Sequence, residues 1–178
     1  MIGLTLRSLA TATVLVAAVS TAAEAQMESP MRFGVKAGIA LPMGDFSDGA
    51  GLGFHVGGHL GMPLSGMFGL RFDADYGRYA GEGFVDNVTL LGGVANLMMN
   101  IETESAFKPY LLAGLGYYNV KVEAFGLQGD ESDLAFNVGA GYNFTLGNSN
   151  MFTELRYLSI QTDGTSLNTL PIVIGLRF

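Results

Sequence analysis

Residues 68 to 77 read Phe-Gly-Leu-Arg-Phe-Asp-Ala-Asp-Tyr-Gly, an unbroken alternation of apolar side chains with glycine or charged ones. Successive side chains of a β-strand point to opposite faces of the sheet, so a period of two separates two faces. Phe72 lies on the apolar face, whereas Arg71 and Asp73 lie on the ionic face. The stretch therefore predicts a strand whose two faces meet different surroundings.

The same alternation occurs in seven further segments of the chain. Together the eight predicted strands cover residues 31–41, 52–62, 68–77, 88–101, 108–122, 134–146, 151–161 and 167–178. A β-bulge is expected near Tyr117 and Tyr118, where the phase of the alternation is ambiguous. Tilted strands of about ten residues can cross a bilayer. The pattern predicts an all-β fold, an eight-stranded antiparallel up-and-down transmembrane β-barrel.

The predicted connections alternate in character. Longer, acid-rich stretches follow the odd strands, at residues 42–51, 78–87, 123–133 and 162–166. Shorter links follow the even strands, at residues 63–66, 102–107 and 147–150. Long loops on one side and short turns on the other are typical of bacterial outer-membrane barrels. We therefore expect this location, with both termini in the periplasm.

The first 25 residues predict a cleavable signal peptide, and residues 26–178 the outer-membrane barrel domain. Arg7 supplies a positive start, residues 9–19 form a short apolar run, and Ala23-Glu24-Ala25 supplies a cleavage signal. The apolar run is too short for a spanning helix, which needs about 20 residues.

Composition agrees with a lipid-facing surface. Apolar residues make up 49% of the chain and charged residues only 14%, against roughly 25% charged residues in ordinary soluble domains. The chain has no cysteine, which excludes disulfides and thiolate metal sites. The net charge of -7 argues against a nucleic-acid partner, because phosphate binding needs a basic face.

The apolar faces are expected to contact lipid, because a lipid-facing Arg or Lys near the midplane costs about 2–4 kcal/mol. An eight-stranded barrel has an interior that side chains just fill. The predicted lumen network comprises Lys36, His55, His59, Arg71, Asp73, Asp75, Asn96, Asn137, Glu154, Arg156 and Arg177. Alternation alone does not show which face of the strands is exposed to water. A soluble exported carrier, closed like a lipocalin with apolar residues inside, is therefore the rival.

Aromatic residues near the predicted strand ends indicate two interfacial girdles. One would contain Phe33, Phe68, Phe107, Tyr110, Phe144, Phe152 and Phe178. The other would contain Tyr76, Tyr79, Phe84, Tyr117, Tyr118, Phe125 and Tyr157.

The closing segment, with Leu170, Ile172, Ile174, Leu176 and the C-terminal Phe178, resembles the last strand of bacterial outer-membrane proteins. Residues 108–117, Lys-Pro-Tyr-Leu-Leu-Ala-Gly-Leu-Gly-Tyr, and the pattern Phe152-x-Glu154-x-Arg156-Tyr157 resemble strands of the OmpA/OmpX-like small β-barrel superfamily. The resemblance spans residues 31–178. It implies recognition of the last strand by the outer-membrane assembly machinery, and contact with outer-membrane lipids and lipopolysaccharide. It concerns the barrel only, since no periplasmic peptidoglycan-binding domain is expected.

No catalytic or metal site is expected. His55 and His59 share a face but stand roughly 13 Å apart at about 3.3 Å per residue, too far for one metal ion. His55 could approach Ser47 or Ser166, yet nothing in the spacing supports a hydrolase. We therefore expect a monomeric barrel without cofactor, whose plugged lumen suits a structural, envelope-stabilising role or a loop-mediated interaction. The alternative is a narrow channel or transporter for ions or small apolar molecules.

Overall fold

The computed structural model describes residues 31–83, 85–124, 127–162 and 165–178. The predicted signal peptide, Phe84 and Phe125 lie outside the described residues. No helix in these ranges is both long and apolar enough to span a membrane.

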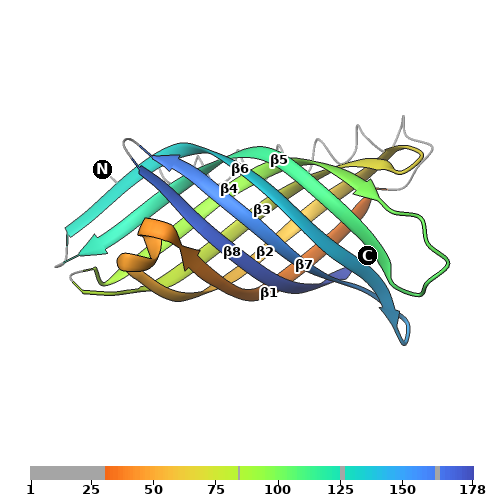
Figure 1. The fold of residues 1–178 in the computed structure, drawn as a ribbon, viewed down its shortest axis with the longest axis horizontal. Coiled ribbons are helices and arrows are strands. Elements are labelled where there is room, and N and C mark those ends of the chain that lie inside the picture. Colours follow the sequence, from red (N-terminus) through yellow and green to blue (C-terminus); the bar gives the residue numbers. More distant parts are fainter. Residues whose placement is uncertain (1–30, 84, 125–126, 163–164) are drawn as a thin grey trace, which may run out of the picture. The chain divides into compact units, whose positions relative to one another are not determined.

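Eight antiparallel strands and one short 3₁₀ helix make up the described chain. They are β1 (Arg32–Met43), η1 (Gly44–Asp48), β2 (Ala50–Ser65), β3 (Phe68–Gly81), β4 (Asn87–Asn100), β5 (Lys108–Ala124), β6 (Leu127–Leu146), β7 (Ser149–Thr162) and β8 (Thr165–Arg177). Each strand pairs with its sequence neighbours, and β1 pairs with β8, so the sheet closes into a barrel of tilted strands (Figure 1). The predicted up-and-down barrel is confirmed.

The two faces of each strand lie as the lipid-facing assignment predicts. On β3, Arg71 is 1% exposed, whereas the adjacent Phe72 is 45% exposed. Val35, Phe54 and Ile174 are likewise exposed on the outside of other strands. Since the carrier hypothesis requires the reverse arrangement, the lipocalin-like alternative is wrong.

Both ends of the barrel sequence lie at one end of the barrel. The Phe178 N–H donates to the Phe33 carbonyl at 2.8 Å, and the Phe33 N–H donates back at 3.3 Å. Helix η1 lies at the opposite end (Figure 1). We call these the terminal end and the η1 end.

Strands extend into stretches that the sequence predicted as loops. The β5–β6 ladder continues to the pair Ala124↔Leu127, so the predicted loop at 123–133 is mostly strand. Val120 and Val122 favour this extension, because β-branched residues suit a pleated surface. The expected bulge near Tyr117 is also wrong, since that register is unbroken. The register shifts instead between β2 and β3, at Ala50/Gly53 and Pro63/Ser65.

The predicted contrast in loop length is therefore not observed. At the terminal end, β2 to β3 and β6 to β7 turn tightly through Gly66 and Gly147, whose φ values are 54° and 61°. Glycine adopts this left-handed conformation without steric cost. The β4–β5 link at the same end, however, covers residues 101–107. It is longer than the segment between β1 and β2 at the η1 end, residues 44–49.

An apolar layer fills the bore towards the η1 end. It contains Ala40, Phe46, Ala50, Tyr79, Val88, Leu90, Val94, Tyr118, Val120, Ala135, Leu158 and Ile160. Phe46 projects from η1, and its ring meets the ring of Tyr79 edge-on with centroids 5.0 Å apart. The short helix thus closes the barrel with a buried aromatic side chain.

Replacing Phe46 with Ala is expected to lower the free energy of unfolding by about 2–3 kcal/mol. The loss is smaller than that for a Phe→Ala substitution in a fully enclosed core, because Phe46 borders the mouth of the barrel. The measurement is a urea titration of the refolded barrel in detergent. Asp45→Ala, in the same helix but exposed, is the control and should change stability by less than about 0.5 kcal/mol. Equal effects of the two substitutions would show that η1 does not pack into the barrel.

Candidate functional site

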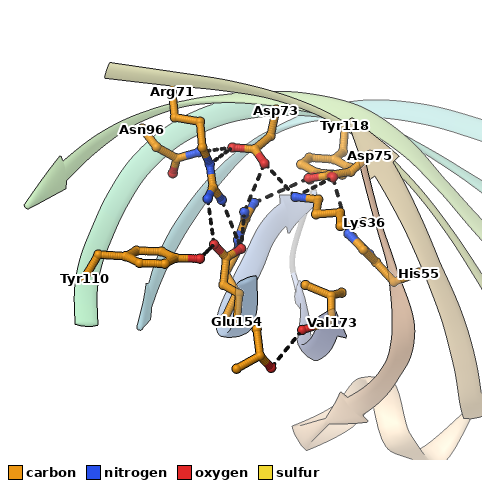
Figure 2. Close-up of polar contacts among 12 residues, drawn as sticks. Lys36, His55, Arg71, Asp73, Asp75, Asn96, Tyr110, Tyr118, Glu154 and Val173 are labelled. Atoms are coloured by element: carbon orange, nitrogen blue, oxygen red, sulfur yellow. Dashed lines mark hydrogen bonds and ion pairs between the residues drawn. The ribbon is translucent and has the colours of Figure 1, made fainter. Parts of the chain in front are cut away.

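An ionic cluster occupies the middle of the barrel (Figure 2). It is built from three strands, with Lys36 on β1, Arg71, Asp73 and Asp75 on β3, and Glu154 and Arg156 on β7. All six residues are buried. Three basic and three acidic groups face one another, so their formal charges cancel.

Lys36 and Arg71 hold the carboxylates from two sides. The Lys36 Nζ lies 2.6 Å from Asp73 Oδ1 and 2.9 Å from Asp75 Oδ1. Arg71 pairs with Asp73 on its own strand at 2.9 Å and reaches Glu154 at 2.7 Å. β1, β3 and β7 are therefore joined across the bore by charged side chains.

Arg156 completes the cluster from β7. Its guanidinium lies 2.6 Å from Glu154, 3.2 Å from Asp73 and 3.4 Å from Asp75. The planar, forked donors of arginine suit contacts with several carboxylates at once. Of the cluster's three cations, Arg156 is thus the only one that forms ion pairs with all three carboxylates.

Neutral donors complete the coordination of the carboxylates. Asn96 donates to Asp73 at 2.8 Å, Tyr110 to Glu154 at 2.8 Å and Tyr118 to Asp75 at 3.1 Å. His55 lies 3.3 Å from Asp75. A buried charge is tolerated only when it is paired and hydrogen-bonded. Each carboxylate here meets both conditions, so the cluster can act as a rigid polar plug.

Three residues of the predicted lumen network lie inside the barrel but outside this cluster. His59 and Arg177 flank Phe152, with ring centroids 5.2 Å apart and the Arg177 Cζ 5.5 Å from the Phe152 centroid. Asn137 is buried, and neither atom of its side-chain amide has a hydrogen-bond partner within the described residues. The structure brings together the other eight, Lys36, His55, Arg71, Asp73, Asp75, Asn96, Glu154 and Arg156.

Sequence reasoning missed the tyrosines of the site. Tyr110 and Tyr118, like Tyr79 and Phe152, are buried in the bore, so their assignment to interfacial girdles is wrong. Tyr79 shares the face of Asp73 and Asp75, and Phe152 that of Glu154 and Arg156. Their position on the ionic face of the strand indicates the bore, and it is a better guide than proximity to the strand ends. For Tyr110 and Tyr118 the alternation along β5 is ambiguous, so the sequence did not show on which face of the strand they lie.

The described residues offer no group of three or more His, Cys, Asp or Glu side chains that could hold a metal ion. His55 is directed at Asp75 and His59 at Phe152. Neither histidine is hydrogen-bonded to a serine among the described residues, so a serine–histidine pair is not assembled in this part of the chain.

The closing residues lie on the outside of β8 and, for Phe178, directly after its end. Ile172, Ile174, Leu176 and Phe178 are exposed, and Leu170 is partly exposed. An alternating apolar face is therefore accessible along this strand. Its recognition by the assembly machinery stays a prediction.

The chain matches the family model described as "Outer membrane protein beta-barrel domain" over residues 10–178. Among solved structures, Neisserial surface protein A is similar with a TM-score of 0.66 and 23% identity, covering 84% of this chain and 96% of that one. Ail of Yersinia pestis has a TM-score of 0.53 and 18% identity, covering 84% and 100%. The outer membrane enzyme PagL has a TM-score of 0.53 and 14% identity, covering 83% and 98%. At these identities the likeness shows the fold alone. No curated protein matches the chain in sequence.

Proposed function

The chain belongs to the family of outer membrane protein β-barrel domains, and from this premise we propose that it is a rigid, non-conducting barrel that stabilises the outer envelope. An outer-membrane barrel has its apolar outer face in lipid and no unpaired sheet edge. The proposed role therefore depends on whether the interior is plugged or conducts ions.

The ionic cluster carries the proposal. Charged side chains from β1, β3 and β7 meet in the middle of the bore, and their formal charges cancel. Moving one of them would leave another buried charge without its partner, at a cost of several kcal/mol. Such a network favours a single packed state of the interior.

A narrow channel needs a continuous water path, and the apolar layer argues against one. Leu90, Leu158 and Ile160 are among its fully buried side chains. An apolar constriction excludes ions by staying dry. An ion leaving the cluster towards the η1 end would therefore meet a packed hydrocarbon barrier.

An ion-flux assay in proteoliposomes tests this proposal. Flotation of the vesicles and a mobility shift between unheated and boiled samples would first confirm that folded barrel is inserted. We expect flux at the level of empty vesicles. Reproducible flux above that level from the inserted, folded protein would contradict the proposal and favour the channel.

Several expectations stay predictions beside it. These are periplasmic termini, a monomeric state, recognition of the C-terminal strand by the assembly machinery, contact with lipopolysaccharide, absence of catalysis, and a loop-mediated interaction. The similar structures include Ail, an attachment invasion locus protein, and the outer membrane enzyme PagL. Family membership alone therefore does not decide between an interaction role and an enzymatic one.

A further inference from the structure

A cavity of about 190 Å³ opens at the terminal end of the barrel. We call it the basic vestibule. Its lining includes Arg32, His59, Arg71, Asn100 and Arg177. These side chains come from β1, β2, β3, β4 and β8.

Positive charge in the vestibule exceeds what its neighbours neutralise. No Asp or Glu belongs to the described lining. Arg71 is neutralised within the ionic cluster through Asp73 and Glu154. Arg32 and Arg177, in contrast, have no carboxylate within ion-pair distance among the described residues. Two unneutralised guanidinium groups therefore border one cavity.

His59 adds an unpartnered polar group to the wall of the vestibule. The residue is only 6% exposed, and its Nδ1 has no hydrogen-bond partner in the described structure. A buried polar atom without a partner is costly and needs an explanation. This nitrogen has almost no accessible surface of its own, so the imidazole would have to rotate to present it to a ligand oxygen in the cavity.

The walls of the vestibule leave room for a ligand. A Cβ added to Gly61 would have its nearest neighbour at 3.6 Å, and one added to Gly66 would meet nothing within 4 Å. Each residue also lines the cavity. Neighbouring atoms do not crowd these two positions, whereas a Cβ added to Gly34 or Gly57 deeper in the barrel would clash with His59 or Asp75.

We propose that the basic vestibule binds the phosphate group of an anionic phospholipid from the membrane leaflet at this end. Forked arginine donors suit phosphate oxygens. The cavity is also lined by Met62, Phe68 and Leu70, which belong to the lipid-facing positions of β2 and β3. The lining thus combines basic groups with membrane-facing apolar residues, which fits a ligand with a charged head and acyl chains.

The test uses the refolded barrel in maltoside micelles and calorimetric titration with short-chain phosphatidylglycerol. A second titration uses inorganic phosphate, to separate a lipid headgroup from a free anion. We expect saturable binding of the lipid and about a tenfold or greater loss in Arg32→Gln/Arg177→Gln. Arg78→Gln is the matched control, because Arg78 is an exposed arginine on β3 that does not line the vestibule. It should bind like the unchanged protein.

Arg32→Gln alone guards against misfolding, because Arg32 is exposed and its loss should leave the barrel's mobility shift intact. We expect this variant to bind several-fold more weakly. Binding of inorganic phosphate without binding of the lipid would overturn the lipid assignment. Absence of saturable binding by either probe, or equal weakening in Arg78→Gln, would overturn the site.

Discussion

Replacing Asp73 with Asn is expected to lower the free energy of unfolding by about 3–5 kcal/mol, the usual cost of removing one partner from a buried ion pair. Asp73 accepts contacts from Lys36, Arg71 and Arg156, and its side chain is fully buried. The substitution keeps the shape of the residue but leaves three cations facing two carboxylates. The destabilisation comes from this uncompensated charge.

The chain has no tryptophan, so the folded fraction would be read from the mobility of unheated samples across a urea titration. Asp86→Asn makes the same chemical change at an exposed position and should shift stability by less than about 0.5 kcal/mol.

A second substitution shows whether Asp73→Asn destabilises the barrel through the uncompensated charge or through the loss of hydrogen bonds. Lys36→Met combined with Asp73→Asn leaves two cations and two carboxylates in the cluster. We expect this double variant to regain more than half of the stability lost by Asp73→Asn, because removing both partners of a buried ion pair leaves no uncompensated charge. A double variant no more stable than the single one would show that the neutrality of the cluster is not what stabilises the barrel.

Replacing Gly175 with Val is expected to prevent closure of the barrel, at a cost of about 3 kcal/mol or more from overpacking. Gly175 pairs with Lys36 on β1 and with Phe152 on β7, so it lies at the closing seam. A Cβ at this position would come within 2.4 Å of the Phe152 ring and of the Val35 carbonyl oxygen. Either the buried ring or the β1 backbone would have to move.

Refolding yield, read as the band that migrates faster without heating, measures closure. Gly58→Val is the matched control, because the nearest atom to its added Cβ is the Gly34 carbonyl oxygen at 3.5 Å. The control should fold as well as the unchanged protein, since a β-branched residue suits a strand. Normal refolding of Gly175→Val would mean that the seam has room for a side chain.

Residue spacing, taken with the cost of placing charge in hydrocarbon, predicted the fold and the buried face of strands such as β3, but not the buried face of β5. Arg71, Asp73 and Asp75 alternate with Phe72 and Ala74, and burial of ionic groups in the bore follows from the cost of placing them in hydrocarbon. Such burial depends on the alternation within one strand and not on which strands meet across the bore.

The partners of those groups depend on the closed barrel. Arg71 and Glu154 are 83 positions apart, and the β3 and β7 strands that carry them are not neighbours in the sheet. Their contact is set by the radius of the barrel and the stagger of its strands. The donors Tyr110 and Tyr118, together with the unneutralised charge at Arg32 and Arg177, became visible only in this arrangement.

The residues of each segment therefore establish a period of two, repeated often enough for a membrane barrel with an ionic interior. Closure of the barrel establishes which charges neutralise one another and which remain open to a ligand. The reason is physical: the face on which a side chain lies is a local property of the strand, whereas its partner across the bore is fixed only when β1 pairs with β8.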